Sequence, residues 1–208
     1  MTPTEQFREL SPTAVADALS RDRVMDIGIR PLWLGMPRIS GPAFPVQCAP
    51  GDNLMLHAAI YRAPPGSIIV AHSGDVDYAL AGGNVCKVAQ KRGIQAFILD
   101  GVIRDLGELR DIRFPVFARG VIPIPGGKKV IGVLGTSPVI CGGVAVAPGD
   151  IVVADEEGIV VVPKDRLLSV LEAAKARAAK DAAEPLETWE KAHRAKIDEM
   201  LLKGGYKD

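Results

Sequence analysis

The first half of the chain alternates amphipathic segments with short apolar runs, which is the pattern of an α/β protein. Ser11 followed by Pro12 predicts a helix start, because serine caps helix N-termini and proline suits the first helical position. We expect that helix to run through Leu19. Two more helices and two buried strands are expected, over "NLMLHAAIYRA" (53–63), "GGNVCKVAQKRG" (82–93, with Gly93 as C-cap), "SIIVAHSG" (67–74) and the run that begins at Ala96.

A proline-containing stretch, residues 38–52 ("RISGPAFPVQCAPGD"), also has the apolar content of a strand. Proline has no backbone N–H to donate to a neighbouring strand, so in sheets it is found mostly at edges and bulges. Pro42 and Pro45 therefore predict an edge strand or a bulged strand and not a central one.

From Gly107 onward the pattern becomes β-rich, with short Val and Ile runs between Gly, Pro and Asp turns. After residue 163 it becomes helical. Asp165 is expected to cap a helix that runs to about Ala183, and Pro185 to separate it from a last helix that ends at Leu202.

The last predicted helix carries an apolar stripe of Leu186, Trp189, Ile197, Met200 and Leu201. The stripe must be buried, either by the chain's own domain or by a neighbouring subunit. We expect one α/β domain over residues 1–165 and a helical C-terminal arm over residues 166–208.

Composition and charge argue against several classes of partner. Lys plus Arg and Asp plus Glu each number 25, so the chain of 208 residues has no net charge with which to attract nucleic acid or an anionic membrane. No apolar run approaches the ~20 residues of a membrane span. We expect no nucleic-acid partner and no membrane partner.

The three cysteines, Cys48, Cys86 and Cys141, are far apart and form no CxxC pair. They are expected to be small buried hydrophobes in a reducing compartment. The N-terminal residues lack the basic and apolar regions of a signal peptide. A cytoplasmic location is therefore expected.

The clearest candidate site follows the buried strand in "ILDGVIRDLGEL" (98–109). Gly101 is expected to turn the chain just past Asp100, so that the next side chains project from the strand's C-terminal end, where α/β sheets bind ligands. Arg104 offers a planar fork for a carboxylate, and Asp105 offers a hard oxygen ligand for Mg²⁺ or Mn²⁺. On spacing alone, a helix-start Asp and a surface Arg remain the simpler interpretation.

A second candidate is the pair Gly82 and Gly83, which precedes the predicted helix 82–93. Backbone N–H groups at a helix start bind anions, although alone this pair is an ordinary turn. Twenty residues separate Gly83 from Arg104. Because the helix and the following strand run in opposite directions, both candidates are expected at one edge, facing one small anion.

For the other polar features, ordinary structural roles are expected. His57 and His72 lack metal-binding spacing and are expected to be core or surface histidines. "PGGKK" (125–129) resembles a phosphate loop only superficially, and a hairpin turn is expected there. No dinucleotide-binding or P-loop motif occurs.

These residues resemble the class II 4-hydroxy-4-methyl-2-oxoglutarate/4-carboxy-4-hydroxy-2-oxoadipate aldolases, a superfamily that also contains the regulator of ribonuclease activity A. The resemblance covers most of the chain from about residue 40 to residue 163. Its segments are "GPAFPVQCAPGDNLMLH", "GGNVCKVAQKRGIQAFILDGVIRDL", "FPVFARG" and "CGGVAVAPGDIVVADEEGIVVVP". It implies a compact β/β/α swivelling-type domain assembled as a homotrimer or homohexamer, with sites at subunit interfaces.

The resemblance also implies residue roles. The loop of Gly82, Gly83, Asn84 and Val85 would bind the substrate carboxylate through its backbone amides, Arg104 would hold the keto acid, and Asp105 would be the protein ligand of Mg²⁺ or Mn²⁺. An acid from a neighbouring subunit's C-terminal region would complete the site, with Glu190 as the candidate and Glu187 as the substitute.

The implied activity is metal-dependent cleavage of a 4-hydroxy-2-oxo acid to pyruvate and a second keto acid, with oxaloacetate decarboxylation as a side activity.

This sequence departs from the family pattern at two places: Gly83 occupies a position where the aldolases often carry an acid, and "IPIPGGKK" (122–129) differs from the usual continuation. Two alternatives stay open. One is a 2-oxo acid decarboxylase that uses the same site, and the other is a non-catalytic protein that regulates an RNA-processing enzyme.

Overall fold

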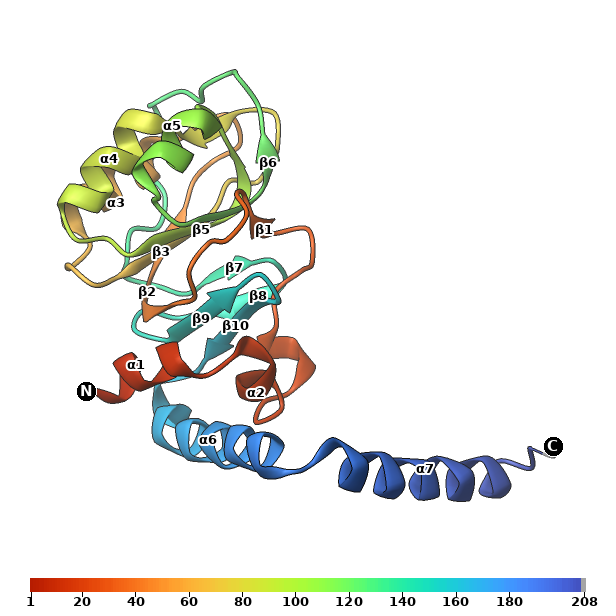
Figure 1. Cartoon of the computed structure of the whole chain (residues 1–208). Helices are drawn as coiled ribbons and strands as arrows, with labels where there is room; N and C mark the ends of the chain where they lie inside the picture. The colour runs from red at the N-terminus through yellow and green to blue at the C-terminus, as the bar shows by residue number, and fades with distance from the viewer. Residues whose placement is uncertain (207–208) are drawn as a thin grey trace.

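The computed structural model describes residues 1–206, which form a mixed α/β body with one projecting helix (Figure 1). The strands are β1 (Arg30–Pro31), β2 (Ile39–Gln47), β3 (Ile68–His72), β4 (Ala79–Ala81), β5 (Ala96–Ile103), β6 (Val116–Val121), β7 (Val139–Cys141), β8 (Val144–Val146), β9 (Ile151–Asp155) and β10 (Gly158–Val162). The α-helices are α1 (Pro3–Gln6), α2 (Pro12–Ala16), α3 (Leu54–Arg62), α4 (Gly83–Lys91), α5 (Leu106–Ile112), α6 (Leu167–Ala183) and α7 (Leu186–Lys203).

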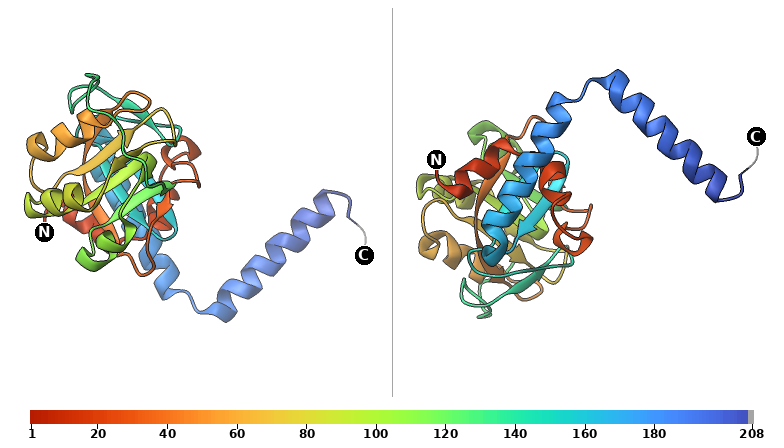
Figure 2. Two further views of the ribbon diagram at one scale, coloured as in Figure 1. Left: turned by 90° about the horizontal axis from the view of Figure 1, so that it is seen from above. Right: turned by 90° about the horizontal axis from the view of Figure 1, so that it is seen from below.

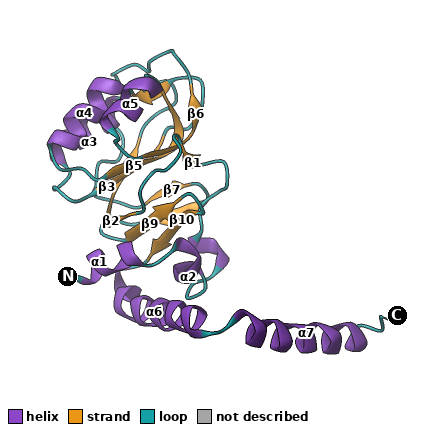
Figure 3. Ribbon diagram, viewed as in Figure 1, coloured by secondary structure: helices purple, strands orange, loops and turns teal. Residues whose placement is uncertain are grey.

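One eight-stranded sheet organises the body, in the order β1-β6-β5-β3-β2-β9-β10, with β4 paired to β5. Strands β2, β3, β5 and β6 run parallel to their neighbours in this set, whereas β9 is antiparallel to both β2 and β10. Strands β7 and β8 form a separate hairpin. The sheet curls into a nearly closed barrel with helices on its outside (Figure 3), which confirms the predicted α/β fold class.

The long apolar runs of the sequence are explained by burial on both faces of the sheet. Along β3, Ile68 and Val70 point into the barrel, where they meet apolar side chains of β9 and β10. Ile69 and Ala71 point outward, into a core shared with α3 and α4. A third core joins the outer face of β9 and β10 to α2 and α6.

The two prolines predicted an edge strand or a bulged strand. That prediction is wrong for β2, which lies inside the sheet between β3 and β9. Residues 39–42 pair with β9, and residues 43–47 pair with β3. Pro42 therefore lies one residue before the stretch paired with β3. Beside Pro45 lies a loop, whose Gly135 N–H donates to the Pro45 carbonyl at 2.8 Å. A central strand tolerates both prolines here because each half of it has a different partner.

Most predicted helices are present, with local differences. The first one, α2, is capped by Ser11 as expected but ends at Ala16, short of Leu19. Helix α5 lies almost wholly in the region predicted to be β-rich, so that prediction is wrong for residues 107–112. Asp165 does not cap α6: a 3-10 turn over Lys164–Arg166 precedes the helix instead.

The two helices of the predicted C-terminal arm differ in their contacts with the body. Helix α6 packs on the body through Val170, Leu171 and Ala174. Helix α7 leads away from the body, and none of its residues is buried (Figure 2). The alternative that the chain's own domain covers the stripe on α7 is therefore wrong. No helix within residues 1–206 has the length and apolar character to cross a lipid bilayer.

Strand β5 corrects the expected turn after Asp100, because the strand continues through Gly101 to Ile103 with an irregularity after Leu99. A side chain at position 101 would lie 2.6 Å from the Ser73 hydroxyl, so glycine is required there by the close approach of β3.

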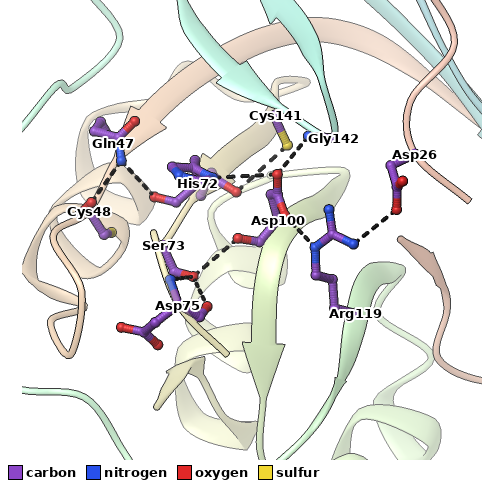
Figure 4. Close-up of polar contacts among 11 residues, drawn as sticks. Asp26, Gln47, Cys48, His72, Ser73, Asp75, Asp100, Arg119, Cys141 and Gly142 are labelled. Carbon is purple, nitrogen blue, oxygen red and sulfur yellow. Dashed lines mark hydrogen bonds and ion pairs between the residues drawn. The ribbon is translucent and has the colours of Figure 1, made fainter. Parts of the chain in front are cut away.

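Asp100 joins a polar cluster on the inner side of the sheet (Figure 4). It accepts hydrogen bonds from Arg119 Nε and, at 2.8 Å, from Gly142 N–H. Arg119 also donates to Asp26 at 2.9 Å. Burial opposes ionisation of Asp100, but these donors outweigh it and hold its pKa below the usual value. The cluster ties β5, β6, the β7–β8 turn and the segment before β1 together.

We predict that Asp100→Asn lowers the free energy of unfolding by about 1–3 kcal/mol at pH 7, because Arg119 loses its charged partner. A lowered carboxyl pKa contributes stability above pH 3.8 that disappears as pH falls through the folded-state pKa. Urea unfolding curves of the two proteins should therefore converge in acid. Asp198→Asn, at an exposed pair on α7, is the control and should change little. Equal stability of Asp100→Asn and the native chain at pH 7 would contradict the assigned role.

Candidate functional site

A small cavity of about 90 Å³ opens where β5 ends and α4 begins. It lies at the C-terminal edge of the parallel strands, the edge at which α/β sheets bind ligands. Its walls come from the start of α3, the β4–α4 loop, the β5–α5 junction and the loop after β6. The lining residues are Asn53, His57, Ala79, Ala81, Gly82, Asn84, Val85, Arg104, Asp105, Glu108, Pro125 and Lys128.

The structure brings the two candidate motifs of the sequence together. Gly83 N–H donates to Asp105 Oδ2 at 3.0 Å, and Arg104 Nε lies 3.5 Å from the same oxygen. Arg104 N–H donates to the Ala81 carbonyl at 3.0 Å, which ties the end of β5 to the loop before α4. The expected geometry is therefore present, whereas the roles of these residues stay predictions.

Asp105 stands in the left-handed backbone region, with φ of 62° and ψ of 39°. Aspartate is among the few non-glycine residues that visit this region readily. The turn at Asp105 separates β5 from α5 and faces its carboxylate toward the start of α4. Because Oδ2 is engaged by Gly83 and Arg104, Oδ1 is the oxygen left for a ligand.

The glycines at 82 and 83 lie very close to charged side chains. A Cβ on Gly82 would lie 2.4 Å from Asp105 Oδ2 and 3.0 Å from Arg104 Cγ. A Cβ on Gly83 would lie 2.1 Å from Glu108 Oε2 and 3.0 Å from Glu108 Cβ. Any side chain at either position would displace a charged group from the cavity.

Glu108 was missed by sequence reasoning because α5 itself was missed. Its carboxylate fills the space that a side chain at position 83 would occupy. It also accepts from Lys87 Nζ at 2.6 Å, an exposed ion pair between α4 and α5. The site thus has an acid beside the loop, although Gly83 itself carries none.

Asn53 was also missed, since an asparagine before a helix is usually only a cap. It is 2% exposed, and its Nδ2 donates to the Ala79 carbonyl at 3.2 Å. Its Oδ1 is buried and has no hydrogen-bond partner in the part of the chain that the structure describes. Leaving a buried acceptor unpaired costs about 1–3 kcal/mol.

His57, one turn further along α3, lines the cavity. Burial lowers its pKa, and the nearby positive charges of Lys128 and Arg104 lower it further. His57 is therefore mainly neutral at pH 7. His72 lies elsewhere, in the polar cluster around Asp100.

The "PGGKK" segment is not a hairpin turn, because β6 and β7 do not pair and the segment belongs to a long loop between them. The Asp52 side chain holds this loop in place. One of its carboxylate oxygens accepts a hydrogen bond from Leu54 N–H, and the other accepts one from Lys129 N–H at 2.6 Å. Burial opposes the charge on Asp52, but these backbone donors outweigh it and lower its pKa. The fastened loop carries Lys128 to the cavity wall.

Glu187 and Glu190 are not part of this cavity within one chain. Both are exposed on α7, which leads away from the helices around the cavity (Figures 1 and 2). The three cysteines are buried and unpaired, and burial raises the pKa of the Cys48 thiol to about 11 and that of Cys86 to about 12. They match the expected inert hydrophobes.

The donor set of the cavity suits a hard cation held mainly by a ligand and water. Within residues 1–206 no three His, Cys, Asp or Glu side chains cluster to form a closed metal site. Mg²⁺ does not require such a cage, because it commonly binds one or two carboxylates together with water and substrate oxygens. Asp105, with its free Oδ1 and with Glu108 nearby, fits that mode.

This fold is shared with the proteins of a known family. This chain belongs to the RraA-like family, described as Aldolase/RraA, whose sequence profile matches residues 12–161. A relative from Halalkalibacterium halodurans, named "Putative 4-hydroxy-4-methyl-2-oxoglutarate aldolase", is 40% identical over 179 residues, covering 86% of this chain and 84% of the relative. A Burkholderia mallei protein with the same name is 33% identical over 140 residues, 67% of this chain and 83% of its own. The resemblance drawn from the motifs is thus confirmed.

Solved structures agree on the fold. An uncharacterized protein from Pseudomonas syringae superposes with a TM-score of 0.77 at 26% identity, covering 92% of this chain and 93% of the other. Streptomyces coelicolor RraAS2, described as an unusual member of the RNase ES inhibitor RraA protein family, gives a TM-score of 0.73 at 26% identity, covering 93% and 96%.

We predict opposite effects for two Gly→Ala substitutions at this site. Gly83→Ala should lower the free energy of unfolding by about 1–3 kcal/mol, because its Cβ collides with Glu108. Gly107→Ala, on α5 with open space around its Cβ, should raise it by about 0.4–1 kcal/mol. Denaturant unfolding measures both. Stabilisation by Gly83→Ala would show that Glu108 does not occupy the space beside the loop.

Proposed function

We propose that this protein is a lyase, a divalent-metal-dependent class II pyruvate aldolase. Its substrate would be a 4-hydroxy-2-oxo acid of the 4-hydroxy-4-methyl-2-oxoglutarate or 4-carboxy-4-hydroxy-2-oxoadipate type, cleaved to pyruvate and a second keto acid. The observation that carries the proposal is the meeting of Arg104, Asp105 and the start of α4 on one cavity. The names of the aldolase relatives support it.

The keto-acid end of the substrate would bind between Arg104 and α4. The first backbone N–H groups of a helix have no partner within the helix, so those of Asn84 and Val85 are suited to a carboxylate. The Arg104 guanidinium can hold two oxygens of the same group in a planar fork. Both interactions place positive charge where an enolate develops.

Asp105 is the residue proposed to hold Mg²⁺ or Mn²⁺, which when bound supplies a Lewis acid for the 2-oxo group. The backbone N–H of Gly83 holds the carboxylate in place. Arg104 shares the same carboxylate oxygen, so the anion-binding and cation-binding groups are held in one fixed arrangement.

Cleavage requires that the C4 hydroxyl lose its proton, that the C3–C4 bond break, and that the bonding pair pass into the pyruvate enolate. Glu108 is the candidate proton acceptor, since Asp105 is committed to Gly83 and Arg104. Protonation of the enolate at C3 then gives pyruvate. Decarboxylation of oxaloacetate produces the same enolate, so it is proposed as a side activity.

The test is a pyruvate-release assay over a panel of 4-hydroxy-2-oxo acids and oxaloacetate. We expect turnover with Mg²⁺ or Mn²⁺, loss of turnover with chelator, and recovery when metal is returned. Trapping of a covalent adduct by borohydride, with turnover that resists chelator, would instead indicate a Schiff-base enzyme.

The same assay separates the alternatives. Release of pyruvate from oxaloacetate alone would make the protein a 2-oxo acid decarboxylase. Absence of turnover with every substrate and metal would favour a non-catalytic role in regulating an RNA-processing enzyme.

We predict that Arg104→Lys lowers kcat/KM by the equivalent of about 2–4 kcal/mol of transition-state stabilisation, because lysine replaces a fork with a point charge. Arg110→Lys, on an exposed face of α5, is the matched control and should retain activity. Near-native kcat/KM for Arg104→Lys would remove this residue from the reaction.

We further propose that the chain assembles as a homotrimer or homohexamer through α7. Trp189 and Met200 on this helix are 47% and 55% exposed, and an isolated helix of 18 residues is marginal in water without a partner surface. A neighbouring subunit would cover the stripe, and Glu190 or Glu187 would then reach that subunit's site.

We predict that deletion of residues 185–208 weakens assembly and activity together. Light scattering reports the mass of the assembly, and pyruvate release reports the activity. An intact chain that is monomeric at micromolar concentration would contradict the assembly. A truncated chain that stays oligomeric and fully active would remove Glu187 and Glu190 from the site.

A further inference from the structure

Helix α7 carries an acid inside its apolar stripe. Each residue of a helix turns the chain by about 100°, so Ile197 lies about 20° and Leu201 about 60° around the axis from Leu186. Glu190 lies between them at about 40°, whereas Glu187 lies at about 100°, outside the stripe. Neither ion pair of α7 within residues 1–206 includes Glu190. A surface that covers the stripe must therefore offer a cation to Glu190, because an unpaired charge is costly to bury.

A patch of exposed apolar side chains borders the mouth of the cavity. We call it the rim patch, and its members are Tyr78, before β4, and Ile124, Val130 and Ile131, in the loop after β6. The two segments lie side by side, since Ala79 N–H donates to the Ile124 carbonyl at 2.8 Å. Ala79 and Pro125 also pair, and both line the cavity. Apolar side chains gathered in this way are typical of an interaction surface, whereas single ones are common on any protein.

The rim patch has its own unpaired charge. Lys129 directly precedes Val130, and its backbone N–H is held by Asp52, so its side chain projects from a fixed loop. That side chain is exposed, and the lysines that form ion pairs within residues 1–206 lie elsewhere. Lys129 is therefore free to pair with an acid from another chain.

We infer that the rim patch is the surface of a neighbouring copy on which α7 lies, with Glu190 paired to Lys129. The inference rests on the proposed assembly and names the surface that receives the helix. Stripe and patch are both apolar, and each holds one unpaired charge of opposite sign, so the contact buries neither charge alone. Because Lys129 follows Lys128 of the cavity wall, Glu190 and not Glu187 is the acid brought to the neighbouring cavity mouth.

A charge exchange tests the pair in the full-length chain. Light scattering over a concentration series gives the concentration at which half of the assembly dissociates. We expect Glu190→Lys and Lys129→Glu each to raise it at least about 10-fold, and the double variant to return within about 3-fold of the native value. Glu187→Lys makes the same charge change outside the stripe, and as the control it should shift the midpoint by less than about 2-fold. A double variant that assembles no better than the weaker single variant would overturn the pairing.

Two serine substitutions test which surface receives the helix. Ile131 is 83% exposed, and Ile131→Ser should raise the dissociation midpoint about 10-fold because the side chain loses its apolar burial in the assembly. Leu34 is 99% exposed, beside Trp33 in a separate hollow of the surface, so Leu34→Ser is the matched control and should leave the midpoint unchanged. Equal effects, or the opposite ranking, would overturn the inference.

The readout is the mass of the assembly and not its activity, so the ways to fail are distinct. An intact chain that is monomeric at micromolar concentration overturns the proposed assembly together with this contact. An assembly that is indifferent to these substitutions overturns the contact alone. An assembly that depends on the charge exchange but releases no pyruvate supports the contact and contradicts the proposed lyase.

Discussion

The hydrogen bond from Gly83 N–H to Asp105 Oδ2 is the interaction on which the candidate site depends. It joins the first turn of α4 to the residue that ends the β5–α5 turn, across 22 positions of sequence. Two features of the chain make this hydrogen bond possible. Glycine at position 83 leaves room for the Glu108 side chain, and Asp105 adopts a left-handed backbone. Arg104 is placed by the same turn, so the groups proposed to bind the anion and the cation cannot be arranged independently.

The helix–strand unit from residue 82 to residue 105 could be predicted from sequence because its signals are local. Helical spacing, with Gly93 just past the end of the helix, and a continuous apolar run fix α4 and the start of β5, although β5 continues past the turn expected after Asp100. Antiparallel packing then brings the start of α4 and the end of β5 to one edge of the sheet. The C-terminal helices were equally clear, since Pro185 separates them. Where a feature depends on residues nearby in sequence, the prediction succeeded.

The failures have a common origin in contacts between distant segments. The position of β2 in the sheet depends on its having two different partners, which proline content alone does not reveal. Asn53 and Lys128 meet because Asp52 holds a loop 77 residues away, and no local pattern encodes that bond. Helix α5 is only seven residues long and begins at a strained turn, so it left a weak periodic signal, and Glu108 was lost with it.

The attachment of the loop between β6 and β7 separates the lining of the cavity from the core of the barrel. The loop contributes Lys128 to the cavity, yet it adds none of its side chains to the fully buried core of the barrel. Its link to the start of α3 runs through a single carboxylate and a few backbone bonds. Substitutions at its exposed positions should therefore cost little folding stability, provided that Asp52 keeps its amide donors and Gly135 its bond to Pro45. The loop thus forms a cavity wall whose side chains are separate from the buried core of the barrel.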